Sequence, residues 1–226
     1  MANIILSAFA DEYADSFEEQ LVGLCKLGIS HIEIRHVNKK NISVLTKTEV
    51  LEVKELLDKY GIKVSAIGSP LGKIKLDGDI DGHIETAKRI FEYANILGAR
   101  FVRVFSFYAP AGRNIVEMKD EAFSALCRLL EAAKEYGVVL CHENEKDIYG
   151  DTASRVFYGD IPARCRELLD AFPDLMCVYD MGNFVLEGVD PYPEAYRLLK
   201  DRIAYFHIKD ALSAGAIVPP GCGEAK

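Results

Sequence analysis

One repeating unit constrains the fold of this chain more than any other feature: an amphipathic helix, a glycine, and then a short apolar strand. Four helix-like segments end at Gly28, Gly61, Gly98 and Gly137, which are 33, 37 and 39 residues apart. Glycine adopts the left-handed conformation that ends many helices, because it has no Cβ to clash with the backbone. Each glycine is followed by a run such as ISHIEIR or RFVRVF. The spacing is that of a βα unit.

Further segments continue the same alternation. We expect an opening strand at residues 3–9, a helix that begins at Ile161-Pro162, a strand at 175–180, a helix near 193–200 and a strand at 203–209. Strands rich in Val, Ile, Leu and Phe with little polar alternation are typical of a parallel sheet covered by helices. The sequence therefore predicts an α/β fold of seven parallel strands. No linker-like break divides it, so we expect a single domain over residues 1–226.

Two architectures suit this pattern, the open doubly wound sheet and the closed (β/α)₈ TIM barrel. No GxGxxG or GxxxxGK[ST] motif follows any strand. Because those motifs build the phosphate sites of nucleotide-binding open sheets, their absence favours the barrel.

Composition excludes several classes of protein. Half of the 226 residues are hydrophobic, which excludes a disordered or collagen-like chain. No charge-free apolar run approaches the roughly 20 residues that span a bilayer, and no signal peptide is evident, so we expect a cytoplasmic protein without a membrane partner. The formal charge of −8 disfavours nucleic-acid binding. The six cysteines form no CxxC pair and are expected to be small buried residues rather than zinc ligands.

Polar side chains stand at the predicted carboxyl ends of the strands, where TIM barrels carry out their chemistry. The fifth, sixth and seventh strands end in Glu143, Asp180 and His207. Carboxylate oxygens and an imidazole nitrogen suit a divalent ion such as Mn²⁺, Co²⁺, Mg²⁺ or Zn²⁺. A lone carboxylate at a strand end can instead cap the next helix, and a lone histidine can simply be hydrogen-bonded. Spacing alone does not separate a metal site from an ion-pair network.

Several strings resemble the sugar phosphate isomerase/epimerase group of the xylose isomerase-like TIM barrels. They are HENEKDIYGDT, YDMGNF and FHIKDA, together with SPLGKI and IEIR, and the likeness covers essentially the whole chain. The resemblance implies that Glu143, Asp180 and His207 hold the metal, with Glu145 as the alternative to Glu143. A fourth ligand, a glutamate on strand eight, also belongs to the family pattern.

The resemblance further implies a metal-dependent isomerase or epimerase of ketose sugars or sugar phosphates. Such an enzyme removes a proton next to a carbonyl and forms an enediolate. We assign the general base to Glu143. The side chains expected to bind substrate are Arg35, Lys73, Asn183 and Lys209, and those expected to support the site are Glu33 and Glu145. For Arg35 and Lys209 the alternative is an ion pair, and for Glu33 it is a buried pairing with Arg35 or Arg103.

The chain departs from the family pattern after the seventh strand. Only LSAGAIVPPGCGEAK follows FHIKDA, and its small residues, Gly and Pro indicate a loop. We therefore expect a barrel without its eighth βα unit, either truncated or completed by another molecule. Its open edges favour homo-oligomers. Inverting a carbon centre needs groups on both faces of the planar intermediate, so one-base isomerisation survives this loss better than epimerisation.

Two other functions remain as alternatives. A degenerate sugar-binding or structural barrel without catalysis is consistent with the missing fourth ligand. The AP endonuclease branch of the superfamily uses many histidines, whereas this chain has five and places Ser69, Ser106 and Asn183 near three of the expected positions. Its acidic charge also disfavours a DNA substrate.

Overall fold

Seven strands form one sheet in the computed structural model, which describes residues 4–145 and 156–225. Neighbouring strands of the sheet follow the order of the chain, and the first and last strands lie at its two ends. They are β1 (Ser7–Ala8), β2 (His31–Ile34), β5 (Lys63–Ile67), β6 (Phe101–Val104), β7 (Val139–Glu143), β8 (Met176–Asp180) and β9 (Ile203–His207). The predicted run of seven parallel strands is confirmed.

Helices connect these strands as the repeat predicts. They are α1 (Phe17–Lys26), α2 (Lys47–Tyr60), α3 (Ile80–Leu97), α4 (Lys119–Tyr136) and α5 (Pro162–Ala171). The four glycines that follow α1 to α4 all have positive φ angles, of 69°, 66°, 74° and 67°. Pro162 occupies the first turn of α5, where its missing N–H costs nothing.

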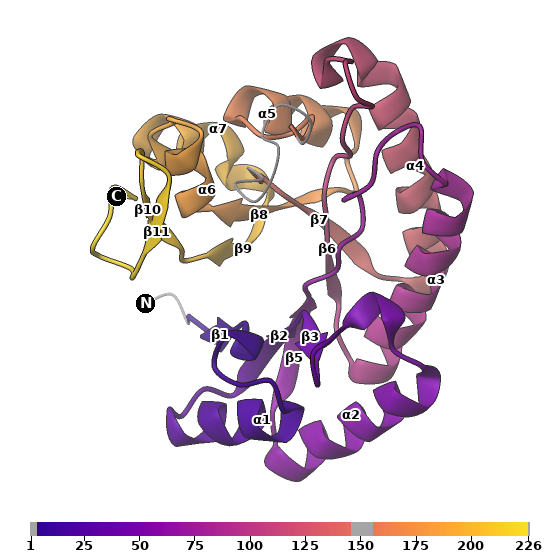
Figure 1. Cartoon of the computed structure of the whole chain (residues 1–226), viewed down its shortest axis with the longest axis vertical. Helices are drawn as coiled ribbons and strands as arrows, with labels where there is room; N and C mark the ends of the chain where they lie inside the picture. The colour runs from indigo at the N-terminus through magenta and orange to yellow at the C-terminus, as the bar shows by residue number, and fades with distance from the viewer. Residues whose placement is uncertain (1–3, 146–155, 226) are drawn as a thin grey trace. The chain divides into compact units, whose positions relative to one another are not determined.

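The chain divides into two compact units, which are described separately. Unit 1 comprises residues 1–70, 84–103 and 132–139, and unit 2 comprises residues 71–83, 104–131 and 140–226. In unit 1, α1 and α2 pack against each other beside β2 and β5 (Figure 1). Phe17, Leu21 and Ile67 of this unit are completely buried.

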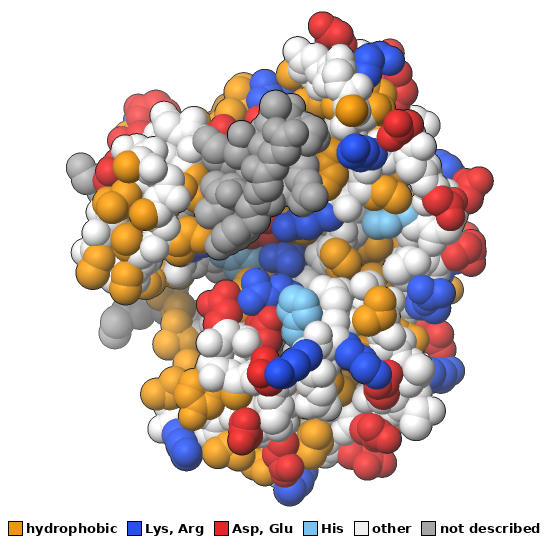
Figure 2. Space-filling model, in the orientation of Figure 1, with side chains coloured by type: hydrophobic (Ala, Val, Ile, Leu, Met, Phe, Trp, Pro, Cys, Tyr) orange, Lys and Arg blue, Asp and Glu red, His pale blue; other side chains and the backbone are white. Residues whose placement is uncertain are grey.

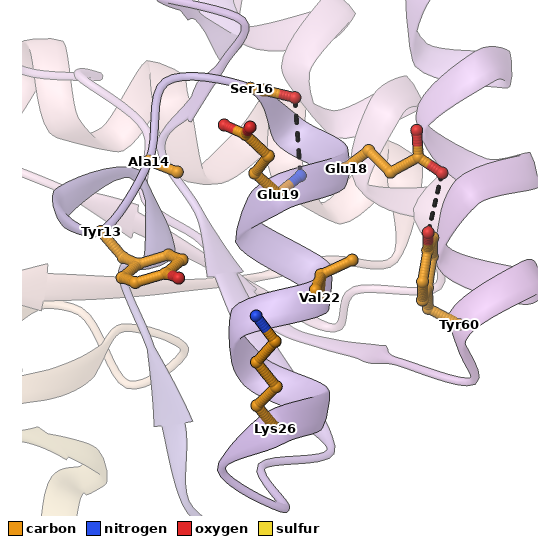
Figure 3. Close-up of a pocket in the computed structure, with 8 residues that line it drawn as sticks. All are labelled: Tyr13, Ala14, Ser16, Glu18, Glu19, Val22, Lys26 and Tyr60. Atoms are coloured by element: carbon orange, nitrogen blue, oxygen red, sulfur yellow. Dashed lines mark hydrogen bonds between the residues drawn. The ribbon is translucent and has the colours of Figure 1, made fainter.

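Side-chain caps set where these two helices begin. Ser16 Oγ accepts the N–H of Glu19 at 3.5 Å and so caps α1 (Figure 3). A two-way capping box begins α2, where Thr46 and Glu49 each accept from the other's backbone N–H.

Charged side chains of both signs are interspersed over the face shown in Figure 2. Some exposed charged side chains form ion pairs, including Lys59 with Glu18 at 2.7 Å and Lys47 with Glu92 at 2.7 Å. Because such pairs are solvated, each contributes little to stability.

Unit 2 contains β8, β9 and α5, together with α6 (Met181–Leu186) and α7 (Tyr196–Leu199) (Figure 1). The helix expected near residues 193–200 is present as α7 and the irregular turn η4 (Pro191–Ala195) before it. Helix α6 was not expected, because its six residues are too few to show a periodic pattern. No helix among the described residues is long and apolar enough to cross a bilayer.

The cysteines follow the expectation only in part. Cys141, Cys165 and Cys177 are buried, but Cys25 and Cys222 are exposed and Cys127 is intermediate. Cys25 lies on α1, whose buried face is formed by neighbouring positions such as Leu21 and Leu24. The expectation of burial was therefore wrong for the two exposed residues.

The C-terminal segment is more ordered than its sequence indicates. We expected a loop, but β10 (Asp210–Leu212) and β11 (Ala216–Val218) pair as an antiparallel hairpin. The segment that follows turns back onto Asp210. The carboxylate of Asp210 accepts backbone N–H groups at 2.8–2.9 Å; the donors are Ala211, Gly221, Gly223 and Ala225. One buried carboxylate therefore holds the end of the chain.

We expect Asp210→Asn to release this end segment. The donated N–H groups, that of Ala225 foremost, hold the pKa of Asp210 below its usual value. Their stabilisation is therefore present above the ordinary aspartate range and is lost as pH falls below it. In the variant an amide NH₂ group would face two N–H donors, so hydrogen exchange at Gly221 and Gly223 should accelerate at neutral pH.

Glu224→Gln is the matched control for this experiment. Glu224 Oε1 accepts from the N–H and hydroxyl of Ser213, both at 3.3 Å, and does not hold the end segment through Asp210. Unchanged exchange at Gly221 and Gly223 in Asp210→Asn would contradict the role of the carboxylate.

Candidate metal centre

Three side chains at the ends of adjacent strands meet in unit 2. Glu143 ends β7, Asp180 ends β8 and His207 ends β9. Asp180 and His207 are register partners in the parallel pair β8–β9, which places their side chains on the same face of the sheet. One ligand atom from each of the three residues lies within 4.8 Å of the others. The structure thus brings together the three residues that the sequence singled out.

Short contacts link the members of this cluster. His207 Nδ1 lies 2.6 Å from Glu143 Oε1 and 3.8 Å from Asp180 Oδ2. Glu143 and Asp180 are 3% and 1% exposed, so their charges are largely removed from water. Two buried carboxylates this close need a nearby positive charge.

Lys209 supplies positive charge beside Asp180. Its Nζ lies 3.1 Å from Asp180 Oδ2. Burial by itself lowers the pKa of Lys209, but the attraction of Asp180, Glu143 and Glu145 outweighs burial and raises it above its usual value. Lys209 is therefore held in its charged form, in the ion pair that the sequence left as the alternative to substrate binding.

Asp180 is also the N-cap of α6. Its Oδ1 accepts the N–H of Asn183 at 2.8 Å, while its Oδ2 faces Lys209 and His207. The sequence posed helix capping and site chemistry as alternatives for this residue. The structure shows capping by one oxygen, with the other oxygen directed into the cluster.

Two buried asparagines surround Asp180. Asn144 Nδ2 donates to the carbonyl of Asp180 at 2.9 Å, and the N–H of Asp180 donates back to Asn144 Oδ1 at 3.0 Å. Asn183 donates from Nδ2 to the Asn144 carbonyl at 2.8 Å and accepts from Lys209 Nζ at 2.6 Å. The amide of Asn183, which we expected to bind substrate, is therefore engaged within the protein. Asn144 was not predicted; its only signal was its place between Glu143 and Glu145.

Glu145 and Lys73 pair with each other beside the cluster. Lys73 Nζ lies 2.9 Å from Glu145 Oε2 and 4.3 Å from the centre of the Phe105 ring. Burial, and then the charge of Glu143, raise the pKa of Glu145 although Lys73 opposes this. The group of atoms that could hold a metal ion, among the described residues, contains Glu143 and not the alternative Glu145.

The remaining predicted residues, Arg35 and Glu33, belong to unit 1. Arg35 Nε lies 2.8 Å from Asp11 Oδ2, and its Nη2 lies 3.2 Å from Glu12 Oε1. The guanidinium also lies over the ring of Phe9, at 4.7 Å. Arg35 therefore makes an ion pair, with partners from the loop after β1 that the sequence did not indicate. Glu33 is buried, at 5% exposure.

A surface pocket of unit 1 contains none of the predicted residues. It is lined by the loop before α1, by α1 itself and by Tyr60 at the end of α2 (Figure 3). Tyr60 donates its hydroxyl to Glu18 at 2.7 Å, so one of the charged side chains that line this pocket is already paired. The cluster in unit 2 is the stronger candidate for chemistry.

Comparison with known proteins places the chain in a family. The model of the family described as xylose isomerase-like TIM barrel matches residues 24–225. The chain belongs to this family. No curated protein sequence matches the chain significantly. Membership in the xylose isomerase-like TIM barrel family confirms the resemblance seen in the sequence, and it agrees with the position of the cluster at the carboxyl ends of the strands.

Solved structures of similar fold span most of the chain. The probable 3-DHS dehydratase AsbF from Bacillus anthracis has a TM-score of 0.76 and 16% identity, over 100% of this chain and 86% of that one. A xylose isomerase-like TIM barrel protein from Mycobacterium smegmatis in complex with magnesium has a TM-score of 0.70 and 19% identity, over 97% and 82%. A D-tagatose 3-epimerase-like protein has a TM-score of 0.70 and 19% identity, over 91% and 75%. At these identities the likeness shows the fold.

The donor set of the cluster fits a divalent ion. Two carboxylate oxygens and one imidazole nitrogen are the ligand types that Mg²⁺, Mn²⁺, Co²⁺ and Zn²⁺ accept. The atoms lie within 4.8 Å of one another, and both carboxylates are buried. Their negative charge would favour a cation at this point.

Proposed function

We propose that this protein is a divalent-metal-dependent isomerase or epimerase of ketose sugars or sugar phosphates. The observation that carries the proposal is the convergence of Glu143, Asp180 and His207 within 4.8 Å at the ends of three adjacent strands. Proteins of similar fold include an L-ribulose 3-epimerase and the 3-keto-D-glucoside 4-epimerase YcjR from E. coli, which supports a sugar as the substrate class.

Each residue of the cluster has a proposed role. Glu143, Asp180 and His207 hold the ion, and a bound divalent ion would polarise a carbonyl and stabilise the neighbouring enediolate. Glu143 accepts the proton that leaves the carbon atom next to the carbonyl. Lys209, which lies between Asp180 and Asn183, donates a hydrogen bond to a substrate oxygen.

Other predicted residues keep supporting roles in the proposal. Lys73 binds a substrate oxygen after exchanging its contact with Glu145, whereas the substrate-binding role of Arg35 stays a prediction from the sequence. Asn183 acts through Lys209, because its side-chain oxygen accepts from Lys209 Nζ.

The cluster favours isomerisation over inversion of a carbon centre. One base on one face of a planar enediolate can move a proton between adjacent carbons. Inversion also needs a proton donor on the opposite face. The group of metal-ligating atoms found among the described residues contains two carboxylates and one imidazole, and Glu143 is the base among them. We therefore propose aldose–ketose isomerisation as the principal reaction.

Exchange of carbon-bound hydrogen with solvent tests the proposal whichever product the reaction forms. The protein is incubated in D₂O with Mn²⁺, Co²⁺, Mg²⁺ or Zn²⁺ and a panel of ketoses and their phosphates, and ¹H NMR follows loss of the signal next to the carbonyl. We expect metal-dependent exchange with at least one sugar. Absence of exchange across the panel would contradict an enzyme of this type.

A second candidate is a sugar-binding barrel without catalysis. The observation that favours it is that the cluster is already neutralised in part, since Lys209 pairs with Asp180 and His207 contacts Glu143. A protein of this kind would show no increase in Tm with Mn²⁺ or Co²⁺. It would also show no effect of His207→Ala on sugar binding.

We also propose self-association through β9, at the end of the sheet. Phe206 of β9 is 45% exposed and Ile208 just after it is 63% exposed. Exposed apolar side chains on an edge strand favour pairing with another chain. Light scattering should give a mass above that of one chain, and Phe206→Lys should shift it towards the monomer.

Leu51→Lys is the matched control, because Leu51 is 48% exposed but lies on helix α2. It should leave the mass unchanged. A wild-type protein that is monomeric at all concentrations would rule out association through β9.

A further inference from the structure

We propose that Asn144 is a positioning residue that fixes Asp180 for the cation, an inference that rests on the proposed metal-binding function. Its side-chain amide makes a two-point contact with the backbone of Asp180, through Nδ2 to the carbonyl at 2.9 Å and through Oδ1 from the N–H at 3.0 Å. Asn144 follows the last residue of β7, and Asp180 is the last residue of β8. The amide therefore joins the ends of the two strands that carry Glu143 and Asp180.

Both residues are buried, so the loss of either hydrogen bond in this contact is costly. Asn144 is 0% exposed and Asp180 is 1% exposed, so water does not replace a lost partner. A buried N–H or carbonyl without a hydrogen bond is costly, and the backbone of Asp180 would shift to find one. Asparagine carries a donor and an acceptor at the separation that both backbone groups need.

Any such shift would reach the carboxylate of Asp180. Its Oδ1 is held by the N–H of Asn183 at 2.8 Å, and its Oδ2 faces Lys209 and His207. Asn183 is itself held by Asn144, because its Nδ2 donates to the Asn144 carbonyl at 2.8 Å. Asn144 thus supports the ligand oxygen along two routes, through the Asp180 backbone and through Asn183.

This role differs from support of the fold alone. Residues that orient a metal ligand from outside the coordination shell change metal affinity by about 10–100-fold when they are replaced. A residue that only stabilises the fold lowers Tm and leaves the affinity of the folded protein unchanged. Metal affinity and the spectrum of the bound metal therefore separate the two roles.

The test uses Asn144→Asp and cobalt chloride as the probe. The substitution keeps the size of the side chain and its acceptor for the Asp180 N–H, but removes the donor to the Asp180 carbonyl. Its added negative charge would by itself tighten cation binding, so a weaker affinity can only reflect lost positioning. We expect about 10–100-fold weaker Co²⁺ binding by calorimetry, and altered visible absorption bands of the bound Co²⁺.

Asn95→Asp is the matched control. Asn95 Nδ2 also donates to a backbone carbonyl, that of Tyr136 at 2.9 Å, but it is exposed and lies in unit 1. This variant should bind Co²⁺ as wild type does. If Asn144→Asp does not fold, Asn144→Ala takes its place in the Co²⁺ measurements. This variant removes the amide without adding charge.

The outcomes distinguish this inference from the function on which it rests. Wild-type protein that binds no Co²⁺ overturns both. Wild-type protein that binds Co²⁺, with folded Asn144 variants of equal or tighter affinity and unchanged spectra, overturns only the positioning role. Weaker binding with altered bands in the Asn144 variants, and not in Asn95→Asp, supports it.

Discussion

Replacing Glu143 by glutamine lowers the rate of solvent proton exchange at the substrate carbon by about 10²–10⁴-fold, the usual contribution of a positioned base. Glutamine has the size of glutamate, and its Oε1 can still accept from His207 Nδ1, which lies 2.6 Å from the present carboxylate. Its amide cannot accept the proton. The measurement is the D₂O exchange rate with the best sugar and metal found for the wild-type protein.

Two further variants separate the loss of the general base from the loss of a proposed metal ligand in this experiment. His207→Ala should weaken Mn²⁺ or Co²⁺ binding, read as a smaller metal-induced rise in Tm, while Glu143 stays in place. Glu145→Gln removes a carboxylate from the same segment, one that pairs with Lys73 at 2.9 Å and lies outside the group of ligand atoms. A Glu143→Gln variant with exchange as fast as that of Glu145→Gln, at saturating metal, would refute the assignment of the base.

The proximity of Glu143, Asp180 and His207 could be predicted from the sequence because it depends on strand order and register. Parallel strands that follow one another in the chain end at the same edge, so Glu143, Asp180 and His207 were expected to meet once their strands were recognised. The four helix-ending glycines gave the order of the strands up to β7, and the apolar runs at 175–180 and 203–209 gave the two strands that follow. Neither inference depends on any side-chain contact.

The surroundings of the cluster could not be predicted in the same way. The pairing of Asn144 with Asp180 joins residues 36 positions apart through a side chain and a backbone, and no periodic pattern marks such a contact. The partner of Arg35 was also missed, because Asp11 lies in a short turn after β1 that has no hydrophobic pattern. Long elements have a periodic signal, whereas single hydrogen bonds between loops do not.

The C-terminal hairpin is a second feature that hydrophobic periodicity in the sequence does not predict. Gly and Pro in LSAGAIVPPGCGEAK indicate turns, and three-residue strands such as β11 are too short to stand out between them. A polar contact, the four N–H groups on Asp210, orders the segment together with the packing of Ala211 and Ala225 against Val185 and Leu186. A sequence pattern based on hydrophobic spacing does not detect an anchor of this kind.

The largest loss of stability is expected for Gly72→Ala, in the loop of unit 2 that carries Lys73. Gly72 has a φ of +83°, and a Cβ at this position would lie 2.0 Å from the backbone oxygen of Phe105. The backbone of Phe105 cannot retreat freely, because the N–H of Phe105 donates to the Leu71 carbonyl at 2.7 Å and that of Phe107 donates to the Gly72 carbonyl at 3.1 Å. Left-handed strain and overpacking together should lower the free energy of unfolding by about 3–5 kcal/mol.

Gly188→Ala separates the two causes in this prediction. Gly188 has a similar φ of +72°, but no atom lies within 4 Å of the position its Cβ would take. Conformational strain alone should therefore cost about 1–2 kcal/mol. Thermal unfolding measures both variants, and Gly72→Ala should lower Tm by about 6–20 °C, against about 2–8 °C for Gly188→Ala. Equal losses in the two variants would show that the close approach of Gly72 to Phe105 does not constrain this loop, and that strain alone explains the glycine.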